Sequence, residues 1–275
     1  MDSSKKTGIA NIIRFYSAWR GMNSGLAGIF AITIIGVFHI VLRDYDFDIL
    51  NFKTIFYYKT VIILAVVFLI VNGTFLILSI YLGCDRTAGR GRQICASDWS
   101  MLDFILIAVI STLQSATPAA ALLGNDGRYS GLLIWIAYAF MYFAVRRSLR
   151  LRQWYLDLFL AAGMGACIIG ILQYFDIDPI GFKNLMDPGQ YYMFTSTIGN
   201  INTYTSYAAM LFGASVLLFF TEEVRIRKTW YLFCMSVSFT ALITWMSDNA
   251  YIEIFAMIGL LYWQCYGRNS GACTG

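Results

Sequence analysis

Charged residues are scarce in this 275-residue sequence, and no stretch of it is polar enough to form a water-soluble domain. Aspartate, glutamate, lysine and arginine together make up 13% of the residues, whereas hydrophobic residues make up 59%. The mean hydropathy is +0.63. Because a soluble core cannot hide that much apolar surface, these values lie outside the usual soluble range. The scarcity of charge therefore predicts a membrane protein.

Histidine occurs only at position 39, and the sequence contains no Walker loop, GxGxxG turn or HExxH helix. A nucleotide-driven pump and a zinc protease are therefore unsupported. The six cysteines form no CxxC pair and have no histidine partner, which argues against a metal or redox centre. We predict no bound metal and no cofactor. His39 falls within the first apolar run, where packing or a hydrogen bond is the expected role of a lone histidine.

Apolar runs recur along the whole chain. A transmembrane helix needs about 20 residues, because a rise of about 1.5 Å per residue must cross about 30 Å of hydrocarbon. Most of the runs reach or approach this length, so the sequence predicts an all-α, polytopic transmembrane bundle of about eight spans. The bundle is expected over residues 25–266, after a segment 1–24 and before a short polar tail 267–275. The runs are residues 25–42, 60–82, 101–114, 131–145, 155–174, 202–220, 230–246 and 250–266.

Basic residues concentrate in alternate connections between these runs, as the positive-inside rule requires. This pattern predicts a cytoplasmic N-terminus and C-terminus, with outer loops at 43–59, 115–130 and 175–201. The expected location is the cell membrane, crossed several times, with the active face outward. Clusters flanking the membrane suit anionic headgroups better than nucleic acid, so membrane lipids are expected partners and nucleic acids are not. The basic residues expected on the outer side are Arg43, Lys53, Lys59, Arg128 and Lys183.

Three outer segments, 124–131, 196–203 and 246–250, place small polar residues at the predicted start of a span. A helix start favours an anion, such as a lipid-linked phosphate, because its backbone N–H groups are unpaired and its dipole is positive there. Arg128 can bind phosphate oxygens, while Asn200 and Asn202 can exchange hydrogen bonds with sugar hydroxyls. The alternative is that Asn202, Thr203 and Ser247 only cap helices and that Arg128 only anchors the membrane interface.

The same segments resemble the O-antigen ligase and O-antigen polymerase family of bacterial membrane glycosyltransferases. The similarity covers roughly residues 101–261. Ile201 stands where proline is common in that family, and Asp248 follows Ser247 where many members have arginine. The residues that carry the resemblance are Leu123-Gly124, Arg128, Gly131-Leu132-Leu133, Ile171-Leu172-Gln173-Tyr174, Asp178-Pro179 and Thr197-Ile198-Gly199-Asn200-Ile201-Asn202.

The resemblance implies transfer of a glycan from a polyprenyl diphosphate carrier to an acceptor sugar on the outer face, in ligation or polymerisation of a surface polysaccharide. The expected partner is thus a lipid-linked oligosaccharide, and neither nucleotide sugar nor metal is needed. No catalytic base is identifiable, although Glu253 lies one helical turn after Asn249. Family members continue beyond Leu261 with further spans and a large outer loop, so this chain alone is expected to be catalytically incomplete. The implied substrate-binding residues are Arg128, Gly199, Asn200, Asn202 and Asn249.

Two other functions stay open. Asp44, Asp46 and Asp48 follow the first run, where metal-dependent glycosyltransferases that use polyprenyl-phosphate sugars carry an acidic pair. A transporter or a non-enzymatic assembly subunit would use polar residues within spans, such as Asn72 and Glu253. A helix-to-helix hydrogen bond explains Asn72 more simply, and the chain has no internal repeat of the kind that transporters show.

Overall fold

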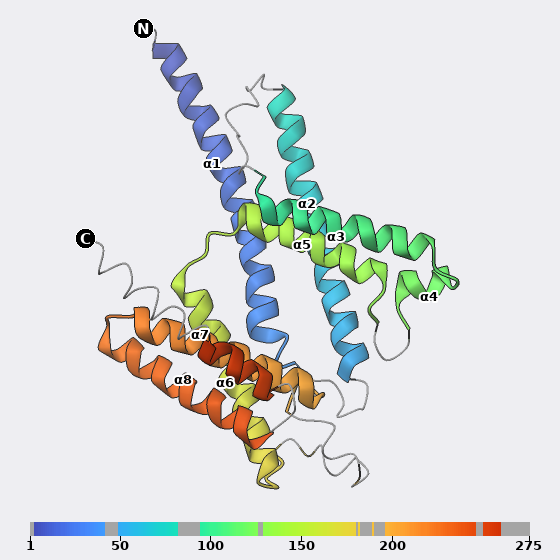
Figure 1. Ribbon diagram of the computed structural model, residues 1–275. Helices are drawn as coiled ribbons and strands as arrows, with labels where there is room; N and C mark the ends of the chain where they lie inside the picture. The colour runs from blue at the N-terminus through green and yellow to red at the C-terminus, as the bar shows by residue number, and fades with distance from the viewer. Residues whose placement is uncertain are drawn as a thin grey trace, which may run out of the picture. The chain divides into compact units, whose positions relative to one another are not determined.

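A computed structural model gives the structure of the chain and describes residues 3–41, 49–81, 94–125, 129–179, 181, 189, 196–245 and 250–259. These residues form helices and no strand, which confirms the predicted all-α class for the part of the chain described (Figure 1). A further helical segment covers 250–259. The elements are α1 (Ser3–Ile32), a π-helical turn η1 (Thr33–Val37), α2 (Ile49–Tyr81), α3 (Ala96–Leu113), α4 (Pro118–Leu123), α5 (Leu132–Ser148), α6 (Gln153–Tyr174), α7 (Ile201–Thr221) and α8 (Arg225–Thr244).

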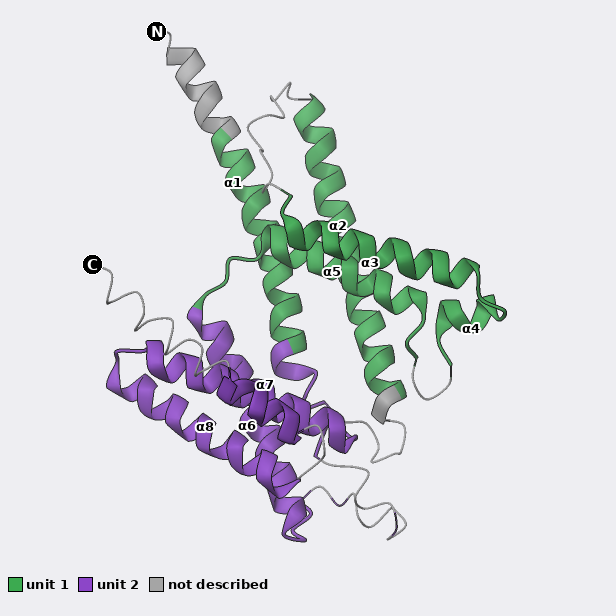
Figure 2. Cartoon of the chain, in the orientation of Figure 1, with its two compact units in different colours: residues 1–34, 50–152 green, residues 35–49, 153–275 purple. Residues whose placement is uncertain are grey.

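The chain divides into two compact units (Figure 2). Unit 1 comprises residues 1–34 and 50–152, and unit 2 comprises residues 35–49 and 153–275. One boundary lies inside η1, where the helix is locally wound as a π-helix, a form usually found as a single turn within an α-helix. The apolar periodicity of the sequence does not predict this division, since the runs continue on both sides of it.

The chain is a multi-pass membrane protein. Within the described residues, five segments are long and apolar enough to cross a bilayer, and they correspond to five of the eight predicted runs. At 17 residues α5 is shorter than the roughly 20 that a span needs, and α8 begins with three basic residues within four positions. Eight spans and cytoplasmic termini therefore stay predictions. The five segments are Ile13–Val37, Asn51–Tyr81, Ala96–Leu113, Gln153–Tyr174 and Ile201–Thr221.

Two predicted outer loops contain helix. The prediction of a loop at 43–59 is wrong for most of that range, because α2 begins at Ile49. The stretch has no glycine or proline, and Phe52 and Phe56 lie one turn apart with their ring centroids 6.4 Å from each other. Lys53, expected as an outer-loop charge, is buried on α2. The loop expected at 115–130 includes α4, which has a proline at its first turn, a favoured position.

Unit 1 holds α1 against α2 through aromatic rings and a polar network. The ring of Phe75 on α2 stacks on Trp19 and Phe15 of α1, with centroid separations of 4.4 and 4.8 Å. Asn72 exchanges hydrogen bonds with Asn23 and accepts one from the indole Nε1 of Trp19 at 3.0 Å. The helix-to-helix hydrogen bond predicted for Asn72 is thereby confirmed. Its second amide hydrogen goes to the Phe68 carbonyl oxygen, so no hydrogen-bonding capacity of this side chain remains for a transported solute.

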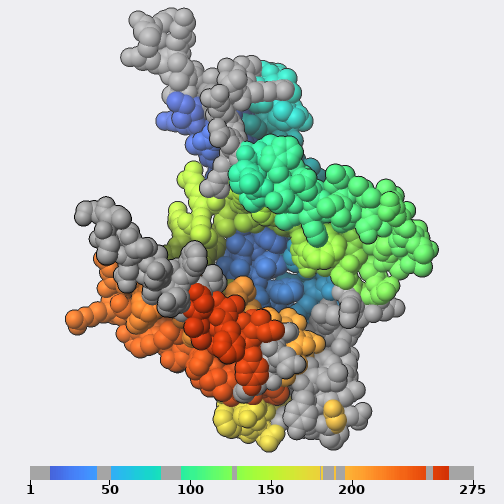
Figure 3. All heavy atoms as spheres, viewed as in Figure 1, coloured from blue at the N-terminus to red at the C-terminus, as the bar shows by residue number. Residues whose placement is uncertain are grey.

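Unit 1 also exposes long apolar surfaces. Only 17% of the span in α2 and 6% of the span in α3 are buried within the protein. Figure 3 shows α3, in green, on the surface of unit 1. Its exposed side chains include Ile107 and Leu113. Such apolar surface suits contact with lipid chains.

Unit 2 is a bundle of α6, α7 and α8, in which α7 and α8 are joined by the three residues 222–224. Leu160, Tyr204, Leu211 and Leu242 are fully buried in its core. Glycines on α6 allow α7 to approach closely. The space beside Gly163 is filled by the Leu211 side chain, and the space beside Gly170 is filled by the Tyr204 ring. Small residues at such contacts are a common basis of helix packing in membranes.

Candidate functional site

The polar segment before α7, predicted as part of the site, is anchored in unit 2 by buried hydrogen bonds. The backbone N–H of Ser196 donates to Oε1 of Gln173 at 2.6 Å, and the Ser196 hydroxyl donates to the Ala166 carbonyl oxygen at 2.6 Å. The hydroxyl of Thr197 donates to the His39 carbonyl oxygen at 2.5 Å. Ser196 and Thr197 are each 2% exposed, so α6 and the turn at His39 fix the path of the chain into α7.

Gly199 is a conformational requirement of this segment. Its φ angle is +94°, in the region that glycine adopts readily and other residues rarely do. The residue is buried, and the chain turns there to bring the next two polar side chains to the surface. Gly199 is therefore placed to shape the site through its backbone.

Asn200 is the N-cap of α7. Its Oδ1 accepts hydrogen bonds from the backbone N–H groups of Asn202 and Thr203, at 2.9 and 3.2 Å. The N-cap is therefore Asn200, and the capping role predicted for Asn202 and Thr203 is wrong. The Asn200 side chain is exposed and its Nδ2 donates no hydrogen bond within the described residues. Asn202 is also exposed, so two side-chain amide groups lie at the protein surface at the start of one helix.

His39 lies beside this segment, and its predicted position is wrong. It falls in a turn after the first candidate span, which ends at Val37, instead of within that span. Its ring stacks on Tyr207 of α7, with a centroid separation of 4.3 Å. The expected packing role is confirmed by this contact. The sequence pattern does not predict the turn, because Phe38, Ile40 and Val41 continue the apolar run through it.

Glu253 lies in the helical segment 250–259, which packs on the core of unit 2 through Ala250, Ile254 and Met257. Its Oε2 atom is buried and has no hydrogen-bond partner within the described residues. It stays a candidate base. Arg128, Asn249 and the aspartates at 44, 46 and 48 lie outside the described residues, so their predicted places beside Asn200 or a metal are predictions still. The described ranges hold no group of three or more His, Cys, Asp or Glu side chains that could bind a metal ion.

A second polar cluster joins α3 to α5 in unit 1, and sequence reasoning missed it. Arg146 forms an ion pair with Asp98, which is buried, and its Nη2 donates to the Cys95 sulfur at 2.6 Å. The Ser97 hydroxyl lies 3.0 Å from the same sulfur and accepts a hydrogen bond from Tyr142. The sequence signal was opposite charges in the first turn of α3 and the last turn of α5. Arg146 belongs to the basic residues that follow the predicted fourth run, and the positive-inside rule does not indicate that it pairs with Asp98.

Cys95 is expected to react as a thiolate at a lower pH than an ordinary cysteine. Hydrogen bonding to Ser97 lowers its pKa, and the charge of Arg146 adds to this effect. We expect its rate of alkylation by iodoacetamide to rise with pH through a midpoint below that of free cysteine. The measurement uses protein in which the cysteines at 84, 265 and 273 are serine.

Ser97→Ala should raise this midpoint, because it removes the largest stabilising contact of the thiolate. The buried Cys167 and Cys234 provide the internal control, since both should remain unmodified while the protein is folded. A midpoint that Ser97→Ala and Arg146→Gln leave unchanged would show that neither neighbour stabilises the thiolate.

Comparison of the chain with models of known families, with curated proteins and with solved structures found no match.

Proposed function

We propose that this chain acts in membrane glycan transfer, in which a saccharide moves from a polyprenyl diphosphate carrier to an acceptor sugar on the outer face of the membrane. The observation that supports this most is the anchored turn before α7. Buried Ser196 and Thr197 hold it, Gly199 shapes it, and the amides of Asn200 and Asn202 leave it at the surface. The residues that carry the family resemblance in this region are thus also those with a defined polar geometry.

This reaction requires the protein mainly to position the two sugars and to stabilise the charge of the leaving group. The acceptor hydroxyl oxygen forms a bond to the anomeric carbon of the donor sugar as the bond from that carbon to the diphosphate oxygen breaks. The diphosphate leaves with the electron pair, and the hydroxyl proton passes to a base. A protein accelerates this step by orienting the hydroxyl and by placing hydrogen-bond donors where the diphosphate charge develops.

The start of α7 suits the task of orienting the sugars, because its amide donors are already fixed. Asn200 uses its oxygen for the cap, so its Nδ2 has a defined direction before any ligand binds. Pre-organised donors cost little to order on binding. In the eight-span arrangement that we propose, Arg128 and Asn249 reach the same outer face. They would add a guanidinium and a further amide to the site.

The test is binding of a purified polyprenyl diphosphate-linked saccharide to the purified chain in nanodiscs, which does not require turnover. Asn200→Ser keeps a capping oxygen but removes the amide donor, and it is expected to weaken binding about two- to tenfold. That is the effect of losing one hydrogen bond to a neutral sugar hydroxyl, about 0.5–1.5 kcal/mol. Asn202→Ala should weaken binding to a similar degree.

The matched control is Ser206→Ala, an exposed site one turn further along α7. It should bind the carrier as the unchanged chain does. Retained affinity in both Asn200→Ser and Asn202→Ala would mean that the turn is only a helix cap, and the proposal would lose its main support.

A further inference from the structure

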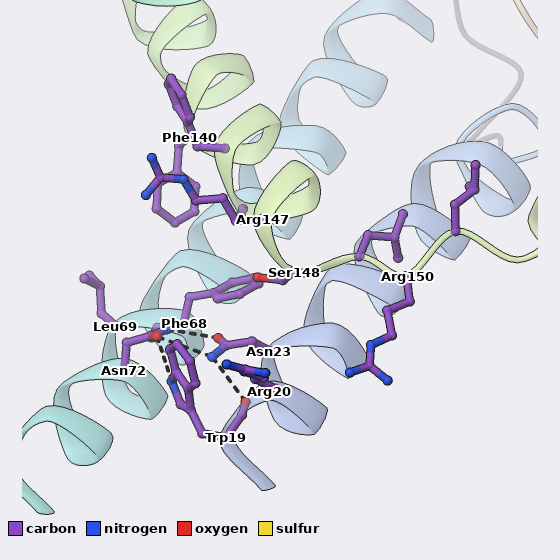
Figure 4. A pocket seen from close by; sticks show the side chains of 14 residues that line it. Trp19, Arg20, Asn23, Phe68, Leu69, Asn72, Phe140, Arg147, Ser148 and Arg150 are labelled. Atoms are coloured by element: carbon purple, nitrogen blue, oxygen red, sulfur yellow. Dashed lines mark hydrogen bonds between the residues drawn. The ribbon is translucent and has the colours of Figure 1, made fainter. Parts of the chain in front are cut away.

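A pocket of about 970 Å³ lies within unit 1 (Figure 4), and its lining includes none of the residues of the proposed glycan site. Side chains from α1, α2 and α5 line it, together with the three residues that follow α5. Its size is at the upper end of the range of small-molecule sites in proteins. The helices around it are fixed by side-chain contacts, since Asn72 joins α2 to α1 and Phe68 packs edge-on against Phe140 of α5.

Among the described residues, the charge that lines the pocket is of one sign. Arg20, Arg147 and Arg150 line it, and no described aspartate or glutamate does. The guanidinium of Arg147 lies over the Phe143 ring, 5.8 Å from its centroid, so an aromatic contact positions it without neutralising it. Neither Arg147 nor Arg150 forms an ion pair with a carboxylate of the described residues. An anion with several oxygens is the complementary ligand, because guanidinium groups bind phosphate as a fork.

The other residues that line the pocket are either apolar or have polar groups that are already hydrogen-bonded. Phe68, Leu69 and Phe140 supply hydrocarbon surface, while Asn72 and Asn23 are occupied by their hydrogen bonds to each other. Leu69 is 68% exposed, so the apolar wall continues onto the outer surface of α2. A ligand that fits both parts has an anionic head and a hydrocarbon chain.

We infer that this pocket binds the phosphate headgroup of an anionic membrane phospholipid, with the acyl chain lying along α2 past Leu69. The arginines hold the phosphate, and the aromatic wall covers the glycerol and the first methylene groups. All three arginines belong to the basic clusters that predict the cytoplasmic side. The anionic cytoplasmic leaflet attracts such clusters by about 1 kcal/mol per basic residue. The site is separate from the outer glycan site and goes beyond the proposed function.

The experiment measures lipid retention by native mass spectrometry. The full chain, purified in a non-ionic detergent, is incubated with equal amounts of phosphatidylglycerol and phosphatidylcholine that have identical acyl chains. We expect the chain to retain phosphatidylglycerol at least about tenfold over phosphatidylcholine, and Arg147→Gln with Arg150→Gln to abolish this preference. Arg152→Gln with Arg225→Gln removes the same charge at exposed arginines outside the pocket and should leave the preference unchanged.

Three results would overturn the inference. One is that the unchanged chain shows no preference between the two lipids. This result does not depend on the folding of any variant. Another is an equal loss of preference in the pocket pair and the control pair, which indicates attraction by net charge alone. The third is displacement of the retained phosphatidylglycerol by a few millimolar inorganic phosphate, which assigns the arginines to a free anion. Arg147→Lys with Arg150→Lys keeps the charge but removes the fork geometry of the guanidinium groups. This pair should therefore retain only part of the preference for phosphatidylglycerol.

Discussion

Replacing Asp98 by alanine is expected to destabilise the protein by about 1–3 kcal/mol, because it removes the partner of a partly exposed guanidinium and a hydrogen bond to a charged group at the start of α3. Asp98 is 4% exposed and pairs with Arg146, and its second carboxylate oxygen accepts the backbone N–H of Cys95 at 3.2 Å. The substitution leaves a guanidinium without its counter-charge and removes the cap at the start of α3. Unfolding in mixed micelles, followed by circular dichroism, measures the change.

The control for this prediction is Glu223→Ala, an exposed carboxylate between α7 and α8 and outside the candidate spans. It should change the free energy of unfolding by no more than about 0.5 kcal/mol. Replacing both partners, by Asp98→Leu with Arg146→Met, should recover most of the loss, because an apolar pair of similar volume leaves no charge without its partner. Equal effects of Asp98→Ala and Glu223→Ala would show that the ion pair contributes nothing to stability.

Gly170→Leu is expected to cost about 3 kcal/mol or more and to disrupt the packing of unit 2. Even a Cβ atom at this position would overlap the Tyr204 ring, whose hydroxyl donates to the Cys167 carbonyl oxygen at 3.1 Å. The ring is fully buried and cannot move aside without losing that hydrogen bond. Gly170→Ala should cost about 1–3 kcal/mol, the usual penalty for overpacking a core. The thermal midpoint of the purified protein in detergent reports both changes.

Gly165 is the matched control on the same helix. A Cβ added there meets nothing within 4 Å, so Gly165→Ala should leave stability unchanged or raise it by up to about 1 kcal/mol. Tyr204→Leu should partly rescue Gly170→Leu by making room. A midpoint for Gly170→Leu equal to that of Gly165→Ala would mean that α6 and α7 do not approach as closely as the structure places them.

Most of the helices can be predicted from the sequence, because each of these depends on a local apolar run; α4, which lies in a predicted outer loop, is an exception. The ends of the helices are harder to place. The basic residues Lys53 and Lys59 favour a loop, yet α2 passes through both, because a lysine can lie on a helix while its stem packs on apolar neighbours. The turn at His39 is not predicted for the opposite reason, since its neighbours are apolar.

The candidate site was predicted in part. Polar residues before the sixth run indicated a helix start, and α7 does begin at Ile201 with Asn200 as its cap. Which asparagine caps the helix depends on the path of the backbone, and buried hydrogen bonds to Gln173 and His39 determine that path. These partners are distant in the sequence. The same holds for Asp98 and Arg146, whose pairing no periodicity indicates.

The amides of Asn23 and Asn72 matter for the order in which the chain enters the membrane. An unpartnered amide in hydrocarbon costs about 1–3 kcal/mol or more, so α2 alone carries a penalty at the middle of its apolar run. Because α1 is synthesised first, its Asn23 and Trp19 are present when Asn72 leaves the ribosome, and the pair satisfies the amide as it forms. The two helices are thus suited to enter the bilayer as a hairpin, with the polar side chains closed against each other before the rest of unit 1 assembles.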